Sequence, residues 1–366
     1  MAEIWPDQSV MVNANVVIDV DNKNSEKNVN RSFIFSKFHA GYFRISISLA
    51  SQALLWKALN EHNHSSHYYN QHFMEKLLST TFLLLWYLSL LVLLVLSILY
   101  LMRCIFYFRM IKDEFLHFVG VNYMFTPWTS WLLLLQSTRL LNPEHFIYKG
   151  LWLFFVIPLL VLDVKIYGQW FTTEKRFLSV VANPTSQMSI IGNMVAAWAA
   201  GKMGWKESAT CMFTLAITHY LVIFVTLYQR LSGGNQLPAR LRPVYFLFVA
   251  APSMGSLAWS SISGSFDTPC KMLFYLSLFL FASLICRPGL FKKAMKKFNV
   301  AWWAYSFPLT FLAMASIEYA QEAKSTAATG LMLILTLIST VILLCLLLST
   351  ALNIHNLVRP TNSVDN

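Results

Sequence analysis

Charged residues are scarce in this sequence. Asp, Glu, Lys and Arg make up 12% of its 366 residues, about half the fraction that is usual for a soluble domain. Hydrophobic residues make up 56%, and several uncharged runs exceed the roughly 18 residues that mark a membrane span. The clearest runs are 77–102 and 331–352. This composition excludes an ordinary soluble domain and predicts an all-α polytopic membrane protein.

Cysteine is also rare. The five cysteines are an odd number and lie far apart, which gives neither a disulfide framework nor the spacing of a metal site. The first 38 residues are polar and lack the apolar core of a cleavable signal peptide. We therefore expect a cytosolic N-terminal tail at 1–38, a transmembrane domain of ten helices at 39–355 and a cytosolic C-terminal tail at 356–366. The N-terminal tail offers serines to a regulatory protein kinase, although its composition favours a simple solvated leader.

The sequence lacks the residue patterns of an enzyme. Catalysis within a membrane needs paired ionisable groups, a histidine-rich metal cluster or a nucleophile with its base. The ionisable residues of the expected spans do not form such sets; they are Arg44, Asp163, Lys165, His219 and Glu318. No Walker motif, no dinucleotide-binding glycine fingerprint and no Arg-rich voltage-sensor helix occurs. We expect no enzymatic activity, no cofactor and no metal.

The apolar runs predict ten membrane spans. More than twice as many Lys and Arg residues lie on the side that holds both termini as on the opposite side. The positive-inside rule then places both termini in the cytoplasm. This topology, rather than a nucleic-acid partner, explains the net charge of +11. The spans lie at about 40–59, 77–102, 115–137, 148–169, 186–205, 208–229, 243–263, 268–286, 300–320 and 330–353.

Three odd-numbered spans carry aromatic residues beside a proline near mid-span. The prolines are Pro127, Pro252 and Pro308, and the fifth span has Gly192-Asn193 at the corresponding place. One such site per helical hairpin is typical of the internal repeats of transport proteins. Proline frees backbone polar groups, which a membrane tolerates only inside protein or beside water. We therefore expect five helical hairpins around a central pore, with kinked odd helices lining it and even helices outside.

Phe307 directly precedes Pro308 in the ninth span. A bulky aromatic residue at a helix break beside an aqueous path can plug that path, so Phe307 is a candidate pore gate. The alternative is that Pro308 is a packing kink and Phe307 a core residue. This segment alone favours the alternative, whereas three prolines in register favour the pore.

Arg44 lies about one helical turn inside the first span. It can snorkel to the cytoplasmic surface, which we favour, or face the pore and attract anions. In the second case its charge lowers the cost of admitting an anion and its bulk narrows the entrance, and we expect bulk to prevail. Asp163, Lys165 and His219 are assigned structural roles.

Six segments resemble the plant slow-type anion channels, a family related to the bacterial tellurite-resistance protein TehA and to fungal dicarboxylate transporters. The resemblance covers roughly residues 38–355, and the short tails resemble the homologue (SLAH) branch of the family. The segments are Ser51–Trp56, Lys165–Trp170, Ala182–Gln187, Phe224–Arg230, Phe248–Pro252 and Ala301–Pro308.

The resemblance implies ten helices in five hairpins around a pore through each subunit, with three subunits assembled as a homotrimer or as a heterotrimer with related channels. It implies that Phe307 blocks the pore. The family's second pore-facing aromatic residue corresponds to Leu133 here. Arg44 stands where the better-known channels carry a small residue, and the N-terminal tail is shorter than in members activated by a kinase.

The leading hypothesis is passive conduction of chloride or nitrate across the lipid bilayer of the plasma membrane. An inside-negative potential would drive these anions outward. A C4-dicarboxylate transporter is ranked lower, because clamping two carboxylates needs cations and Arg44 is the one candidate that we identify. An electrically silent subunit that modulates conducting relatives is a third hypothesis.

Overall fold

The structure is a computed structural model that describes residues 38–65, 71–172, 178, 182–232, 239–296 and 298–358. The described residues are almost entirely helical and contain no strand. Residues 1–37 and 359–366, which hold most of the two predicted tails, lie outside the described residues. The unit described below is Phe38–Asn366.

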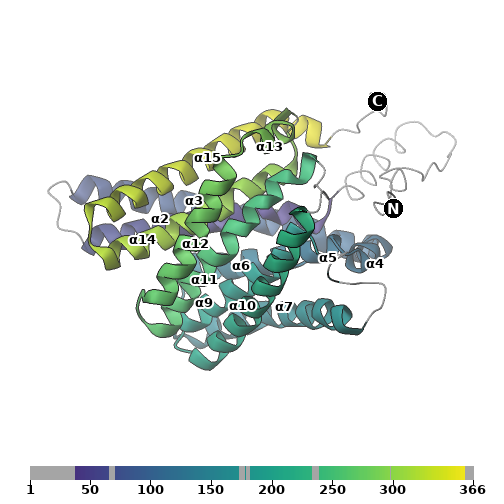
Figure 1. Cartoon of the computed structure of the whole chain (residues 1–366), viewed down its shortest axis with the longest axis horizontal. Helices are drawn as coiled ribbons and strands as arrows, with labels where there is room; N and C mark the ends of the chain where they lie inside the picture. Colours follow the sequence, from purple (N-terminus) through teal and green to yellow (C-terminus); the bar gives the residue numbers. More distant parts are fainter. Residues whose placement is uncertain are drawn as a thin grey trace. The chain divides into compact units, whose positions relative to one another are not determined.

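Five helices form a closed ring in which each contacts the next and the last contacts the first. In Figure 1 the yellow helices near the end of the chain lie beside the purple helices near its beginning, in agreement with the contact between α14 and α2. These helices occupy the odd-numbered spans, which confirms that the odd helices are the inner ones. They are α2 (Arg44–Ser65), α6 (Phe125–Ser137), α9 (Gln187–Lys202), α11 (Leu247–Ser263) and α14 (Ser306–Ala323).

Each inner helix pairs with the longer helix that follows it in the chain. The outer helices are α3 (Gln71–Phe106), α7 (Phe146–Thr172), α10 (Lys206–Ser232), α12 (Thr268–Ile285) and α15 (Thr326–Val358). The first four of them also contact the inner helix of the next hairpin. Their outward faces carry exposed apolar side chains, as a lipid-facing wall requires. Examples, all between 57% and 68% exposed, are Leu84, Phe154, Leu221, Phe279 and Leu337.

Seven helices among the described residues are long and apolar enough to cross a membrane. They include the five outer helices and the spans that contain α11 and α14. α6 and α9 are short, with 13 and 16 residues, and α2 carries several polar side chains. The most apolar window around α14 is 89% buried, so inner helices do not meet lipid and need not be uniformly apolar. The count of ten spans stays a prediction.

Two of the three prolines, Pro127 and Pro308, differ in position from the prediction of mid-helix breaks. Pro127 and Pro308 are each the third residue of an α-helix, and Pro252 lies further inside α11. The 3₁₀ helix η6 (Val300–Tyr305) leads directly into α14. Because N–H groups in the first turn have no intrahelical acceptor, proline costs little there. The irregular backbone at Pro308 is therefore a change from 3₁₀ to α geometry.

The five inner helices begin at the same end of the ring. Each follows a short helix, and these short helices contact one another in chain order. Three of the starts share one motif, in which the side chain of His39, Asn183 or Asn299 accepts a hydrogen bond from the N–H two residues later. The positive ends of the helix dipoles therefore gather at this end. The short helices are η2 (Ala40–Phe43), α5 (Gly120–Tyr123), η3 (Pro184–Ser186), η4 (Ala239–Phe246) and η6.

A buried hydrogen-bond network joins the first hairpin to the last. Gln52 Oε1 on α2 accepts from Thr310 of α14 and from Ser339 of α15, both at 3.1 Å. Gln52 Nε2 donates to Thr340 of α15, also at 3.1 Å. Buried polar groups of this kind stabilise a fold only when they are paired. The network therefore fixes the closure of the ring.

Gly201 allows α9 to approach α11 closely, and we predict that Gly201→Ala is destabilising. A Cβ at Gly201 would lie 2.8 Å from Ser261 Cβ and 3.0 Å from its carbonyl carbon. Because backbone must then move, the free energy of unfolding should fall by about 1–3 kcal/mol, measured by thermal unfolding in detergent. Gly168→Ala in α7 is the control, because its Cβ meets nothing within 4 Å. Equal stability of the two variants would contradict the prediction.

Candidate functional site

Arg44 lies at the start of the ring, where α2 begins. It is 4% exposed, its Nε donates to Gly41 O at 2.8 Å, and its guanidinium carbon lies 4.8 Å from the Tyr123 ring centroid. The expectation that Arg44 snorkels to the surface is therefore wrong, because these contacts hold it inside. Its Nη1 is buried and has no hydrogen-bond partner among the described residues. This N–H group is available to an anion.

His39 lies next to Arg44 and stays uncharged. Its Nδ1 accepts from Gly41 N at 3.0 Å. Burial lowers the pKa of His39 to about 4, and the charges of Arg44 and Arg103 act in the same direction. His39 is therefore neutral at physiological pH, and the positive charge beside Gly41 is that of the Arg44 side chain.

A buried ion pair holds the chain just before Arg44. Nη1 of Arg103 on α3 lies 3.1 Å from Oε2 of Glu114 on α4 (Phe108–Leu116), and the two side chains are 5% and 8% exposed. Glu114 Oε1 accepts from Ala40 N at 2.9 Å, and Arg103 Nη1 donates to Phe38 O. Burial raises the pKa of Glu114, whereas the Ala40 N–H and Arg103 oppose that rise. The pair therefore positions η2, and with it Arg44.

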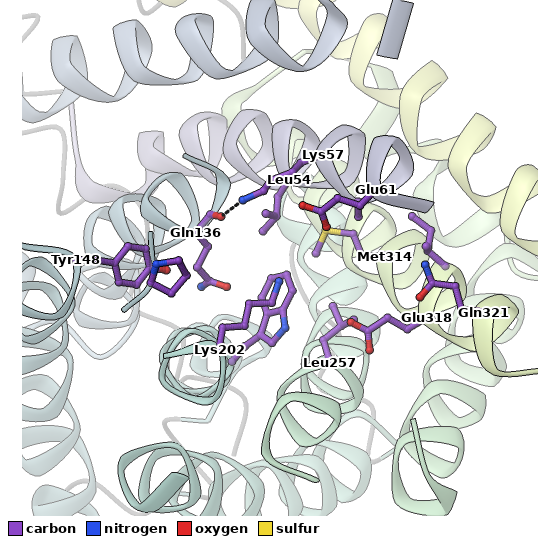
Figure 2. Close-up of a pocket in the computed structure, with 14 residues that line it drawn as sticks. Leu54, Lys57, Glu61, Gln136, Tyr148, Lys202, Leu257, Met314, Glu318 and Gln321 are labelled. Carbon is purple, nitrogen blue, oxygen red and sulfur yellow. Dashed lines mark hydrogen bonds between the residues drawn. The ribbon is translucent and has the colours of Figure 1, made fainter. Parts of the chain in front are cut away.

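A cavity of about 140 Å³ lies at the opposite end, where the inner helices finish. Its lining includes two cations and two carboxylates that are far apart in sequence. Lys57 and Glu61 come from α2, Lys202 from α9 and Glu318 from α14. Figure 2 shows these four side chains extending from three helices around the same space.

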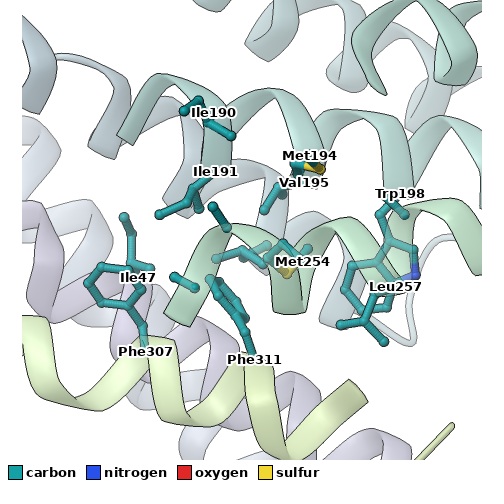
Figure 3. Packing of buried hydrophobic residues seen from close by; sticks show 14 of the residues in the cluster. Ile47, Ile190, Ile191, Met194, Val195, Trp198, Met254, Leu257, Phe307 and Phe311 are labelled. Carbon is teal, nitrogen blue, oxygen red and sulfur yellow. The ribbon is translucent and has the colours of Figure 1, made fainter. Parts of the chain in front are cut away.

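Apolar side chains fill the ring between its two ends. Phe307 and Phe311 of α14 are fully buried, with their ring centroids 5.9 Å apart. Figure 3 shows both rings projecting from α14, with Ile47 beside Phe307 and with Ile191 and Met254 across from them. The middle of the ring is therefore closed by hydrocarbon side chains that surround the two aromatic rings.

The other predicted site residues are buried within the inner helices. Leu133 on α6 is 0% exposed and belongs to the same hydrophobic cluster as Phe307. Pro127, Pro252 and Pro308 are also buried. The assignment of Leu133 to the gate, and of the three prolines to the pore lining, stays a prediction.

Asp163 and His219 make packing contacts, as expected for structural residues. Asp163 is 3% exposed and accepts from Asn193 Nδ2 at 2.7 Å, which ties α7 to α9. His219 Nδ1 lies 2.6 Å from Leu215 O, and its ring stacks on Tyr167. The Asp163 contact therefore joins an outer helix to an inner one, whereas the His219 ring packs between the outer helices α10 and α7.

Sequence reasoning missed Phe311, Lys57 and Lys202. Phe311 had a usable signal, because residues four apart share one face of a helix and Phe307 was already assigned to the pore. Lys57 lies in the first hairpin and Lys202 in the third. Their distance along the sequence therefore does not indicate that they are close in space. The closed ring brings them to one cavity.

The sequence matches the family described as voltage-dependent anion channel, SLAC1, over residues 37–351. The chain belongs to this family. It is 59% identical to the S-type anion channel SLAH1 of Arabidopsis thaliana over 88% of this chain and 83% of that protein. It is 56% identical to the S-type anion channel SLAH4 of the same plant, over 89% and 86% of the two chains.

A third relative differs in length. The guard cell S-type anion channel SLAC1 of Arabidopsis thaliana is 40% identical over 87% of this chain but only 56% of its own length. The higher identity to SLAH1 and SLAH4 supports the SLAH branch within the family. These relatives are named as anion channels and not as enzymes.

We predict that breaking the buried Arg103–Glu114 pair is far more costly than breaking an exposed pair. Arg103→Met or Glu114→Gln leaves one buried group unpaired, so the free energy of unfolding should fall by about 3–5 kcal/mol. Lys271→Met and Glu322→Gln are the controls, because that 3.5 Å pair is 34% and 49% exposed and is expected to contribute about 0–1 kcal/mol. Unfolding in detergent measures both, and similar losses would contradict the prediction.

Proposed function

We propose that the chain is a slow-type anion channel, or a subunit of one, that conducts chloride or nitrate passively across the plasma membrane along the axis of the inner ring. The observation that supports it most is the closed ring of five inner helices around a buried aromatic constriction at Phe307 and Phe311. Membership of an anion channel family supports the ion class. The excess of basic residues beside both termini supports a cytoplasmic location for them.

The starts of the inner helices suit the entry of an anion from the cytoplasm. Five helix N-termini gather there, and each carries a partial positive charge. Arg44 adds a full charge with a buried N–H group that has no hydrogen-bond partner within the described part of the chain. Because a bare anion in an apolar passage is costly, these groups lower the energy of the anion just before the constriction.

The assembly and regulation that the resemblance implies are part of this proposal. We expect a homotrimer, or a heterotrimer with related channel subunits, in the lipid bilayer. The serines that a protein kinase would modify lie in residues 1–37, outside the described residues.

We predict that Phe307→Ala raises the anion current. Removing the ring opens the apolar constriction, and a barrier lower by roughly 1.4 kcal/mol gives about tenfold more current. Voltage clamp of the variant, corrected for surface expression, measures the effect. Phe279→Ala on the lipid-facing side of α12 is the matched control, because Phe279 is 68% exposed and should leave the current unchanged. An unchanged current in well-expressed Phe307→Ala would return Phe307 to an ordinary core role.

We predict that the charge of Arg44 matters more than its bulk. The hydrogen bond to Gly41 and the contact with Tyr123 hold the guanidinium at the wall, which reverses the expectation from sequence that bulk prevails. Arg44→Gln should lower single-channel conductance about three- to tenfold, or roughly 0.6–1.4 kcal/mol, and Arg44→Lys should retain most of it. A conductance that rises in both Arg44→Gln and Arg44→Gly would show that bulk dominates.

A further inference from the structure

The cavity at the far end of the ring is unfavourable for an anion unless cations line it. The C-terminal ends of the inner helices meet there, and each carries a partial negative charge. Lys57 counters that charge directly, because its Nζ lies 3.0 Å from Gln136 O and 3.3 Å from Thr138 O at the end of α6. Lys202 is the last residue of α9, and its Nζ lies 4.1 Å from the Trp198 ring centroid.

Both lysines keep hydrogen-bonding capacity for a further ligand. An ammonium group has three N–H donors, and the two carbonyls occupy two of those of Lys57. An aromatic face, which accepts no conventional hydrogen bond, supports the ammonium group of Lys202. The volume of about 140 Å³ accommodates a small anion with a few waters, since a water occupies about 30 Å³.

Two carboxylates in the same cavity cancel the charge of the lysines. Glu61 and Glu318 are electrostatic neighbours of Lys202. Ion pairs within 4.0 Å among the described side chains join Arg103 to Glu114 and Lys271 to Glu322, not these four groups. The lysines and carboxylates therefore face one another across a space that an ion can enter.

We propose that this cavity is a proton-controlled anion site, in which chloride or nitrate lies between Lys57 and Lys202 and replaces the negative charge of Glu318. When both carboxylates are ionised, the four charges balance, and the partial negative charges of the helix C-termini repel an added anion. When Glu318 takes up a proton, the net charge of the four side chains becomes positive and the anion is bound. Anion binding is thus linked to proton uptake.

The surrounding ionisable groups are consistent with control by these carboxylates. Arg139, after α6, acts on Lys57 electrostatically and adds positive charge, but its guanidinium packs over the Phe82 ring and it is not among the residues that line the cavity. Tyr148 of α7 lines the cavity as a neutral group, and α11 contributes Leu257. Protonation of Glu318 is therefore the change that alters the sign of the charge in the cavity.

Proton uptake by purified protein tests this proposal without relying on conduction. Sodium nitrate or sodium chloride is added to detergent-solubilised protein in weak buffer at mildly acidic pH, with sodium gluconate as the large-anion reference. We expect uptake of roughly one proton per chain with nitrate or chloride and almost none with gluconate. The uptake should be lost in Lys57→Met/Lys202→Met and in Glu61→Gln/Glu318→Gln.

Two further sets of variants keep the outcome decisive. Lys57→Arg/Lys202→Arg retains both positive charges and should retain the proton uptake. Proton uptake that is lost in the Met variant and kept in the Arg variant shows that the positive charges are required. Lys271→Met/Glu322→Gln changes the same residue types on an exposed pair and should leave uptake intact. Equal uptake in the wild type and in Glu61→Gln/Glu318→Gln would overturn the proposal.

The proposal rests on the proposed anion conduction, and a recording separates the two. Acid applied on the side of the cavity should raise the wild-type nitrate current about three- to tenfold, whereas Glu61→Gln/Glu318→Gln should carry a high current that no longer responds to acid. Nitrate current without linked proton uptake would refute the site and leave the channel function. Linked proton uptake without current in any recording would refute conduction by this chain and leave the site.

Discussion

The hydrogen bonds of Gln52 are the interaction on which the rest of the structure depends. A ring of five inner helices encloses a path only if the first hairpin meets the last, and Gln52 makes that junction through Thr310, Ser339 and Thr340. The partners come from helices that lie more than 250 residues away in the chain. Their burial makes the junction specific, because each polar atom that lost its partner would be left unsatisfied in an apolar medium.

The two ends of the ring differ in electrostatic character because all inner helices run in the same direction. At their starts, helix dipoles and Arg44 have the same sign, so the attraction for anions is permanent. At their ends, the dipoles have the opposite sign, and Lys57 and Lys202 face Glu61 and Glu318. The first end is therefore fixed in charge, whereas the second is balanced and can change sign with one proton.

The architecture could be predicted from sequence further than the site could. Long hydrophobic runs, together with prolines near the middle of three odd-numbered spans, were enough to assign the inner and outer helices, because lipid exposure and backbone irregularity leave clear compositional marks. The location of the Arg44 side chain could not be predicted, since a position one turn inside a span allows an arginine either to reach the surface or to stay buried. The contacts of Arg44 with Gly41 and Tyr123 decided it. The cavity could not be predicted from the sequence, because its charged residues come from three different hairpins.

In the 3₁₀ helix η6 before α14, a change of helix type would alter both the rotation and the length of the segment. A 3₁₀ helix turns about 120° and rises about 2.0 Å per residue, against about 100° and 1.5 Å for an α-helix. η6 has six residues, so its conversion to α geometry would unwind the segment by about 120° and shorten it by about 3 Å. Phe307 is the second residue of α14, which begins directly after this segment. The backbone next to Phe307 therefore has the geometry of a screw, in which a small axial displacement corresponds to a large change in the direction of the aromatic ring.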